Sequence, residues 1–149
     1  MTELRMTDPE LREIYRKVRT IAVVGASGNP GKPAYAIPAY LQSQGYRIIP
    51  VNPRGGELYG QRVYPSAPEI PEPVDLVDVF RPPAEAEAVV RDTAELAAAI
   101  IWFEPGTHSP EAVRQARNAG LTVVTGLCLG ATHGRLGLGP GPERPGRAT

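Results

Sequence analysis

One short stretch near the start of the chain limits the folds that the chain can adopt. An uninterrupted run of apolar residues, Ile21–Val24, ends abruptly in a turn rich in glycine, Gly25–Pro33. An apolar run of this length that is followed by turn residues indicates a strand buried inside a parallel sheet. Helix-compatible sequence then runs from Ala34 to Gln44. A strand, a glycine-rich turn and a helix in this order present backbone N–H groups at the start of the helix, where a phosphate group is stabilised.

This turn departs from both standard phosphate-binding patterns. The dinucleotide-binding pattern G-x-G-x-x-G requires glycine at the positions of Ser27 and Pro30. The P-loop pattern requires glycine at Ala26 and a hydroxyl residue at Pro33, so the usual Mg²⁺ ligand is missing and NTP hydrolysis is not expected. A tight turn that binds nothing is the alternative, although an ordinary strand-to-helix loop does not need three glycines.

Composition narrows the class of protein. A chain of 149 residues is long enough for one domain with a hydrophobic core. The formal net charge is zero, so neither nucleic acid nor an anionic membrane is expected as a partner. No apolar run approaches the roughly 18 residues of a membrane-spanning helix, and the first residues lack the pattern of a signal peptide. The single cysteine, Cys128, excludes an internal disulfide, and we therefore expect a cytoplasmic protein.

Predicted strands and helices alternate along the chain. Capping residues predict an N-terminal helix over residues 8–19, and Pro38 is expected to kink the next helix or to delay its regular part. The alternation predicts an α/β fold, an open, mostly parallel five-stranded sheet with helices on both faces. We expect one domain over residues 1–136 and a flexible tail rich in Gly, Pro and Arg over 137–149. The predicted strands are 21–24, 46–51, 74–80, 99–103 and 121–125, and the later helices are 34–44, 84–98 and 109–119.

The end of the second predicted strand indicates which nucleotide would bind. In an open parallel sheet the ligand lies beyond the carboxyl ends of the strands. An NAD-binding fold usually places Asp or Glu at this position to hold the ribose hydroxyl. Here the strand ends in Asn52, Pro53 and Arg54, and no acidic residue occurs before Glu57. An arginine suits a phosphate on the ribose instead, as in NADP or coenzyme A.

Two further cations lie at predicted strand ends or turns. Lysine occurs only as Lys17 and Lys32, which makes the lysine of the glycine-rich turn a conspicuous charge. Lys32 and the N–H groups after Gly25 are candidates to meet a pyrophosphate. Arg81 follows the third predicted strand, where it would serve a second phosphate or seal the crevice.

Four motifs in this order resemble the family of small stand-alone CoA-binding domain proteins. They are Ile21–Ser27 with Asn29-Pro30 and Lys32-Pro33, then Tyr46–Pro53, Asp75–Arg81 and Trp102. The resemblance covers residues 20–136. The family's fold is similar to the N-terminal CoA-binding domain of the succinyl-CoA synthetase α subunit, which implies a Rossmann-like domain.

The resemblance implies that coenzyme A or an acyl-CoA binds at the carboxyl ends of the strands. It places the pyrophosphate at the first turn, the 3′-phosphate near Asn52–Arg54, and the adenine and pantetheine path along the stretches after Phe80 and Trp102. The synthetase subunit carries its phosphorylated histidine in a second domain, so the resemblance does not extend to ligase activity. The expected ligand-binding residues are Gly25, Ala26, Ser27, Gly28, Asn29, Gly31, Lys32, Asn52, Pro53, Arg54, Phe80, Arg81, Pro82, Trp102 and Glu104.

No catalytic group and no metal site is expected. Relatives tend to carry Gln at Glu104, and because a carboxylate is unfavourable beside an anionic ligand, Glu104 is expected to face away. Cys128 would become a nucleophile only with His108 or His133 nearby, and we prefer to interpret it as a small apolar residue packed beneath its loop. Two histidines without a cysteine cluster do not make a metal site.

An alternative function is that of an NADP-dependent oxidoreductase or an NADP-binding regulatory domain. None of the six tyrosines has a lysine four residues later, so the Tyr-x-x-x-Lys pair is missing. A CoA-binding module that does not catalyse a reaction is therefore the preferred hypothesis. A homodimer or an enzyme partner is compatible with such a module, and the sequence does not choose between them.

Overall fold

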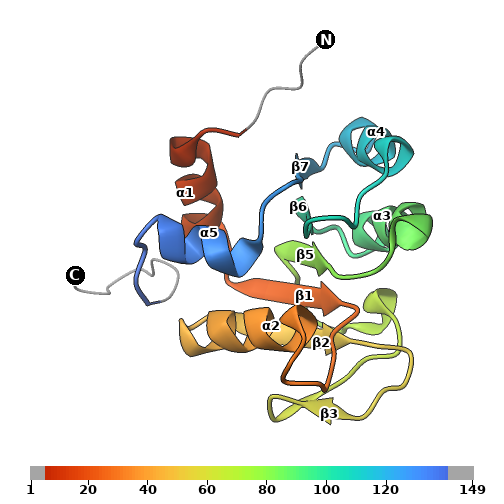
Figure 1. The fold of residues 1–149 in the computed structure, drawn as a ribbon. Helices are drawn as coiled ribbons and strands as arrows, with labels where there is room; N and C mark the ends of the chain where they lie inside the picture. The colour runs from red at the N-terminus through yellow and green to blue at the C-terminus, as the bar shows by residue number, and fades with distance from the viewer. Residues whose placement is uncertain (1–5, 141–149) are drawn as a thin grey trace.

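A five-stranded parallel sheet forms the centre of the molecule (Figure 1). The computed structural model describes residues 6–140. The strand order is β2-β1-β5-β6-β7, and each neighbouring pair is parallel. The predicted α/β, Rossmann-like fold is therefore confirmed. The strands are β1 (Thr20–Val24), β2 (Arg47–Val51), β5 (Leu76–Val79), β6 (Ile100–Phe103) and β7 (Thr122–Val124).

Helices cover both faces of this sheet (Figure 1). One hydrophobic cluster lies between the sheet and helices α3 and α4, and a second lies between the sheet and helices α1, α2 and α5. A two-stranded antiparallel hairpin and two 3₁₀ turns lie outside the main sheet. The helices are α1 (Asp8–Lys17), α2 (Pro33–Ser43), α3 (Ala86–Glu95), α4 (Pro110–Asn118) and α5 (Leu129–Arg135), and the remaining elements are β3 (Glu57–Leu58), β4 (Gln61–Arg62), η1 (Ala67–Glu69) and η2 (Pro83–Glu85).

The chain reverses its direction across the sheet at β1. From β1 it passes outward to β2, and it then returns to β5 on the other side of β1. The carboxyl ends of β1 and β5 therefore flank a topological switch point, where ligands of open α/β sheets bind.

Several predicted boundaries shift by a few residues. The N-terminal helix ends at Lys17 rather than at residue 19, because Val18 is already extended while its N–H caps the helix on the Ile14 carbonyl. The predicted helix 84–98 begins with η2, becomes regular at Ala86 and ends at Glu95. The residues beyond 140 of the predicted flexible tail lie outside the described part of the chain.

Helix α5 is the α-helix that the sequence did not predict. Two of its seven residues are glycine, which gives it poor intrinsic helix propensity. Packing explains the helix: Leu129 is buried, and a Cβ on Gly130 would lie 3.0 Å from Ile37 of α2. Close approach to α2 therefore leaves little room for a side chain at position 130.

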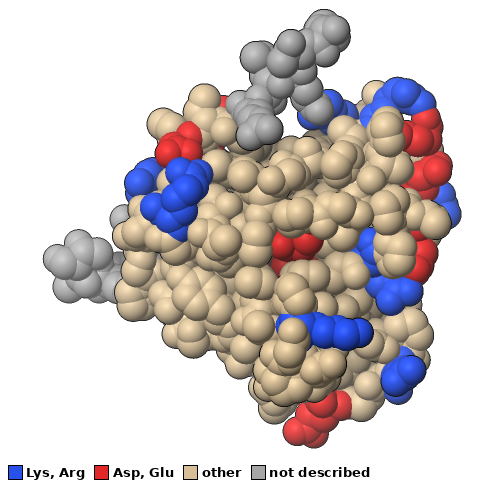
Figure 2. All heavy atoms as spheres, in the orientation of Figure 1, with Lys and Arg blue, Asp and Glu red and all other residues tan. Residues whose placement is uncertain are grey.

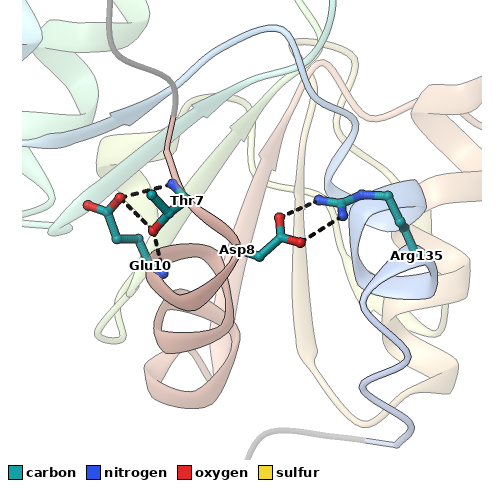
Figure 3. Close-up of polar contacts among 4 residues, drawn as sticks. All are labelled: Thr7, Asp8, Glu10 and Arg135. Carbon is teal, nitrogen blue, oxygen red and sulfur yellow. Dashed lines mark hydrogen bonds and ion pairs between the residues drawn. The ribbon is translucent and has the colours of Figure 1, made fainter.

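Polar contacts at the start of α1 connect it to α5 (Figure 3). The Thr7 hydroxyl accepts a hydrogen bond from the Glu10 N–H, and the Glu10 carboxylate accepts one from the Thr7 N–H, which completes a capping box. The Arg135 guanidinium donates to both carboxylate oxygens of Asp8, at 3.0 and 3.1 Å. The Asp8–Arg135 pair connects α1 to α5. Because the pair is exposed, it contributes little to the stability of the fold.

Candidate ligand-binding site

A groove opens at the carboxyl ends of β1 and β2. Its volume is about 580 Å³, within the range of small-molecule pockets. Residues 55, 57 and 58, which follow the second glycine-rich turn, also border it and were not among the predicted site residues. The lining residues are Ala26, Ser27, Gly28, Lys32, Asn52, Pro53, Arg54, Gly55, Glu57, Leu58 and Arg81.

The backbone N–H groups of the first turn are largely used within the protein. Those of Gly25 and Ala26 donate to the Val51 carbonyl at 3.0 and 3.2 Å. The Ser27 N–H donates to the Ala34 carbonyl at 3.2 Å. The expectation that the N–H groups after Gly25 meet a pyrophosphate is therefore wrong for Ala26 and Ser27. Within the described residues, Gly28 is the position of this turn whose N–H forms no hydrogen bond.

Pro38 explains why the Ser27 N–H has this acceptor. The helix α2 begins at Pro33 and continues through Pro38, so its regular part is not delayed. Because proline has no N–H, the carbonyl of Ala34, four residues earlier, has no partner within the helix. That carbonyl instead accepts the Ser27 N–H, which ties the turn to the first turn of α2.

Replacing Pro38 with alanine is expected to loosen the turn. The new N–H would compete with Ser27 for the Ala34 carbonyl, and hydrogen exchange at the Ser27 N–H should accelerate about tenfold, the equivalent of one net hydrogen bond. Hydrogen exchange followed by NMR measures this directly. Pro33→Ala is the matched control, because Pro33 stands at the first helical position, where it frees no helical carbonyl. Unchanged exchange at Ser27 in Pro38→Ala would contradict the explanation.

Asn29 and Gly31 shape the turn and do not line the groove. The Asn29 side-chain oxygen accepts the Gly31 N–H at 2.9 Å, and the Asn29 N–H donates to the Ser27 hydroxyl at 3.0 Å. The Asn29 carbonyl accepts the Lys32 N–H at 3.0 Å. These local bonds fold the turn so that Lys32 stands immediately before α2 and at the wall of the groove.

Asn52 connects the two loops that form the groove. Its side-chain nitrogen donates to the Ala26 carbonyl at 2.8 Å, and its side-chain oxygen accepts the Arg54 N–H at 2.9 Å. One amide therefore fixes the end of β2 to the turn after β1 and sets the backbone of Arg54. This role for Asn52 is structural, although the residue also lines the groove.

The groove carries two cations without a carboxylate partner. Lys32 and Arg54 are both exposed, and neither forms an ion pair within residues 6–140. Arg81 differs, because its guanidinium donates to both Glu85 oxygens, at 2.7 and 3.1 Å. Arg81 thereby holds the pKa of the Glu85 carboxyl below its usual value. The sealing role predicted for Arg81 fits this arrangement better than a phosphate contact does.

Apart from Arg81, the predicted residues from the later strands lie away from the groove. Trp102 is completely buried, and its indole N–H donates to the Leu127 carbonyl at 2.8 Å. Phe80 is half-buried in the second hydrophobic cluster, and Pro82 is exposed without lining the groove. Glu104 is 4% exposed and accepts the Leu129 N–H at 3.2 Å, so it turns away from the groove as its charge predicts. The structure thus assigns Trp102 to the core.

Cys128 lies in surroundings that disfavour a thiolate. Burial and the nearby Glu104 carboxyl raise the pKa of the half-buried thiol. His133 is buried, and its Nδ1 lies 2.8 Å from the Tyr40 hydroxyl oxygen. Burial also lowers the pKa of His133, which favours the neutral ring. In the described residues, no three His, Cys, Asp or Glu side chains are grouped so that they could hold a metal ion.

A match to a known family identifies the class of protein. The sequence model of a family described as a CoA binding domain matches residues 19–134. The chain therefore belongs to this family, as its motifs predicted.

Individual relatives include both small proteins and larger ligases. The chain is 35% identical over 124 residues to YneT of Bacillus subtilis, across 83% of this chain and 92% of that protein. A solved Thermus thermophilus structure, described as cell-free ID.343, shares 41% identity and a TM-score of 0.84 over 88% of this chain and 99% of that one. The α subunit of acetate–CoA ligase (ADP-forming) I of Pyrococcus furiosus is 31% identical over 83% of this chain, which spans 32% of that subunit.

Proposed function

We propose that this chain binds coenzyme A or an acyl-CoA in the groove at the ends of β1 and β2, and that it has no ligase activity of its own. The observation that carries the proposal is the pair of cations, Lys32 and Arg54, that reach one groove from separate loops without ion-pair partners in the described chain. Coenzyme A carries phosphates at two separate positions, the ribose 3′-phosphate and the pyrophosphate. Two separated cations suit that charge distribution.

The groove suggests how the two phosphate groups would be divided. Arg54 follows β2, where an open α/β fold reads the ribose, and its guanidinium can bond a phosphate with two parallel hydrogen bonds. Lys32 and the unused Gly28 N–H lie on the turn after β1, where the pyrophosphate belongs in such folds. Glu57 adds a carboxylate to the groove wall, and a ribose hydroxyl would be a suitable donor to it.

The absence of ligase activity is part of the proposal and has its own support. A ligase that transfers a phosphoryl group through histidine needs an accessible imidazole. Of the two histidines, His133 is buried among Tyr15, Tyr40 and Tyr46. His108 is exposed, but it lies beside α4 and does not line the groove. In this proposal the chain acts in the cytoplasm as a binding module, alone, as a homodimer or with an enzyme partner.

Calorimetric titration with coenzyme A, dephospho-CoA and NADP tests the proposal. Arg54→Ala is expected to weaken coenzyme A binding by about 1.5–3 kcal/mol, roughly 10- to 150-fold, because one charge-assisted hydrogen-bonding group is lost. Dephospho-CoA should bind the natural protein more weakly than coenzyme A does. The Arg54→Ala substitution should weaken dephospho-CoA binding only slightly further. Arg91→Ala on α3 is the matched control, since it removes an exposed arginine from the opposite layer.

Three outcomes separate the hypotheses. Binding of coenzyme A that weakens in Arg54→Ala but not in Arg91→Ala supports the proposal. Binding of NADP without coenzyme A would overturn it in favour of an NADP-dependent function. Binding of neither ligand, in protein shown by mass spectrometry to be free of carried-over nucleotide, would also overturn it.

A further inference from the structure

Two buried carboxyl groups face each other beneath the start of α5. Asp78 lies on β5 and is fully buried, and Glu104 follows β6 with 4% of its surface exposed. Asp78 is paired in register with Trp102, so Glu104, two residues further on, projects from the same face of the sheet. Neither Asp78 oxygen has a hydrogen-bond partner among the described residues, and the Glu104 carboxyl is the neighbouring group that influences it most.

No cation offsets this pair. None of the ion pairs in the described residues involves Asp78 or Glu104. The other titratable groups that interact with the pair are the Cys128 thiol, from the loop before α5, and the Tyr15 hydroxyl, from α1. Burial raises the pKa of both groups, so both stay neutral near pH 7. The Tyr15 hydroxyl moreover donates to the Leu129 carbonyl at 2.6 Å.

Two neighbouring buried carboxylates cannot both be ionised at low cost, because each loses hydration and repels the other. Burial, followed by the neighbouring Glu104, raises the pKa of Asp78 well above its usual value. The Glu104 Oε2 already accepts the Leu129 N–H at 3.2 Å, so this carboxyl acts as a hydrogen-bond acceptor. Asp78 is the better place for the proton, since it has no other donor and can give that proton to Glu104.

We propose that Asp78 and Glu104 share one proton at neutral pH and that this proton holds the start of α5 on the sheet, as a pH-sensitive link. Loss of the proton would leave two negative charges below Leu129 and Cys128. The effect would pass to the groove through α2, because α5 packs on Ile37 and Tyr40 of that helix, which begins next to Lys32. The link is a property of the ligand-free protein and does not depend on which nucleotide binds.

The direction of the pH effect follows from proton linkage. The Asp78 carboxyl has a higher pKa in the folded than in the unfolded protein, so the folded state binds the proton more tightly. The stabilisation that Asp78 contributes is fully present at pH values below the pKa of its carboxyl in the unfolded state. It is lost as the pH rises through the pKa of that carboxyl in the folded state. Between those two values the unfolding equilibrium constant rises tenfold per pH unit for one proton.

Comparison of the natural protein with Asp78→Asn isolates this effect. The amide is similar in shape, stays neutral and can donate to Glu104. The ratio of the unfolding constants, natural protein over variant, is expected to rise with pH between 5.5 and 7.5 in urea titrations, by up to about tenfold per pH unit while Asp78 stays protonated in the folded state. Glu95→Gln is the matched control, because it neutralises an exposed carboxylate at the end of α3 and should leave the ratio constant. A ratio for Asp78→Asn that does not change with pH would overturn the proposal.

Two measurements keep the test valid if Asp78→Asn does not fold. Carboxyl ¹³C NMR of the natural protein should find one Asp carboxyl still protonated at pH 7, and its absence would overturn the shared proton. Hydrogen exchange at the Leu129 N–H, corrected for the intrinsic rate, should accelerate as the pair loses its proton. Protection of Leu129 that is constant through that titration would overturn the link to α5. None of these readouts uses coenzyme A, so they stand apart from the proposed function.

Discussion

Trp102→Ala is expected to lower the free energy of unfolding by about 3–5 kcal/mol. The indole is completely buried between the sheet and α1, and its ring lies edge-on to Tyr15 at a centroid distance of 6.0 Å. Alanine would leave a cavity and would leave the Leu127 carbonyl without its 2.8 Å donor. Urea denaturation at constant pH measures the loss.

Trp102→Phe separates the two contributions. Phenylalanine retains an aromatic ring but cannot donate to Leu127, so a smaller loss, on the order of 1–3 kcal/mol, is expected. Both variants should bind coenzyme A with nearly natural affinity at temperatures where they are folded, because Trp102 does not line the groove. A stable Trp102→Ala protein that had lost its ligand would contradict the assignment of Trp102 to the core.

Trp102 shows what a sequence pattern predicts and what it does not. The runs 21–24 and 99–103 are short and entirely apolar, and they predicted strands of a parallel sheet correctly because buried strands need little else. The same pattern places a residue near a carboxyl end without saying which face it occupies. Trp102 points into the core with Asp78 as its register partner, and that follows from packing that the sequence does not display.

The groove was predictable to the extent that its residues follow strands directly. Lys32 and Arg54 stand on turns rich in glycine, which marks both loops. Gly55, Glu57 and Leu58 were missed for two reasons. Gly55 continues the turn after Arg54, and Glu57 and Leu58 form β3, whose placement depends on contacts with the first turn, such as Leu58 near Gly28. The internal use of the Ser27 N–H was equally hidden, since it depends on a carbonyl freed by Pro38, eleven residues later.

The close approach between the chain after β1 and the chain after β5 explains why position 25 must be glycine. Gly25 has a φ of +94°, a conformation that residues with a Cβ adopt only with strain. A Cβ there would lie 2.8 Å from the Arg81 Cδ and 3.0 Å from the Phe80 carbonyl oxygen. The Arg81 side chain could move at the expense of its bonds to Glu85, whereas the Phe80 backbone is fixed by its hydrogen bond to Val24 of β1.

Gly25→Ala is therefore expected to lower the free energy of unfolding by about 2–5 kcal/mol through backbone strain and overpacking together. Gly56→Ala is a closely matched control, because Gly56 has the same φ of +94° and a Cβ there would meet nothing within 4 Å. The loss in free energy of unfolding for Gly56→Ala should reflect backbone strain alone, about 1–3 kcal/mol. Urea denaturation of both variants gives the difference, which measures how tightly β1 and β5 meet at the switch point. Equal losses in the two variants would mean that Phe80 and Arg81 yield to a methyl group, and that the close contact between these strand ends does not hold the groove in shape.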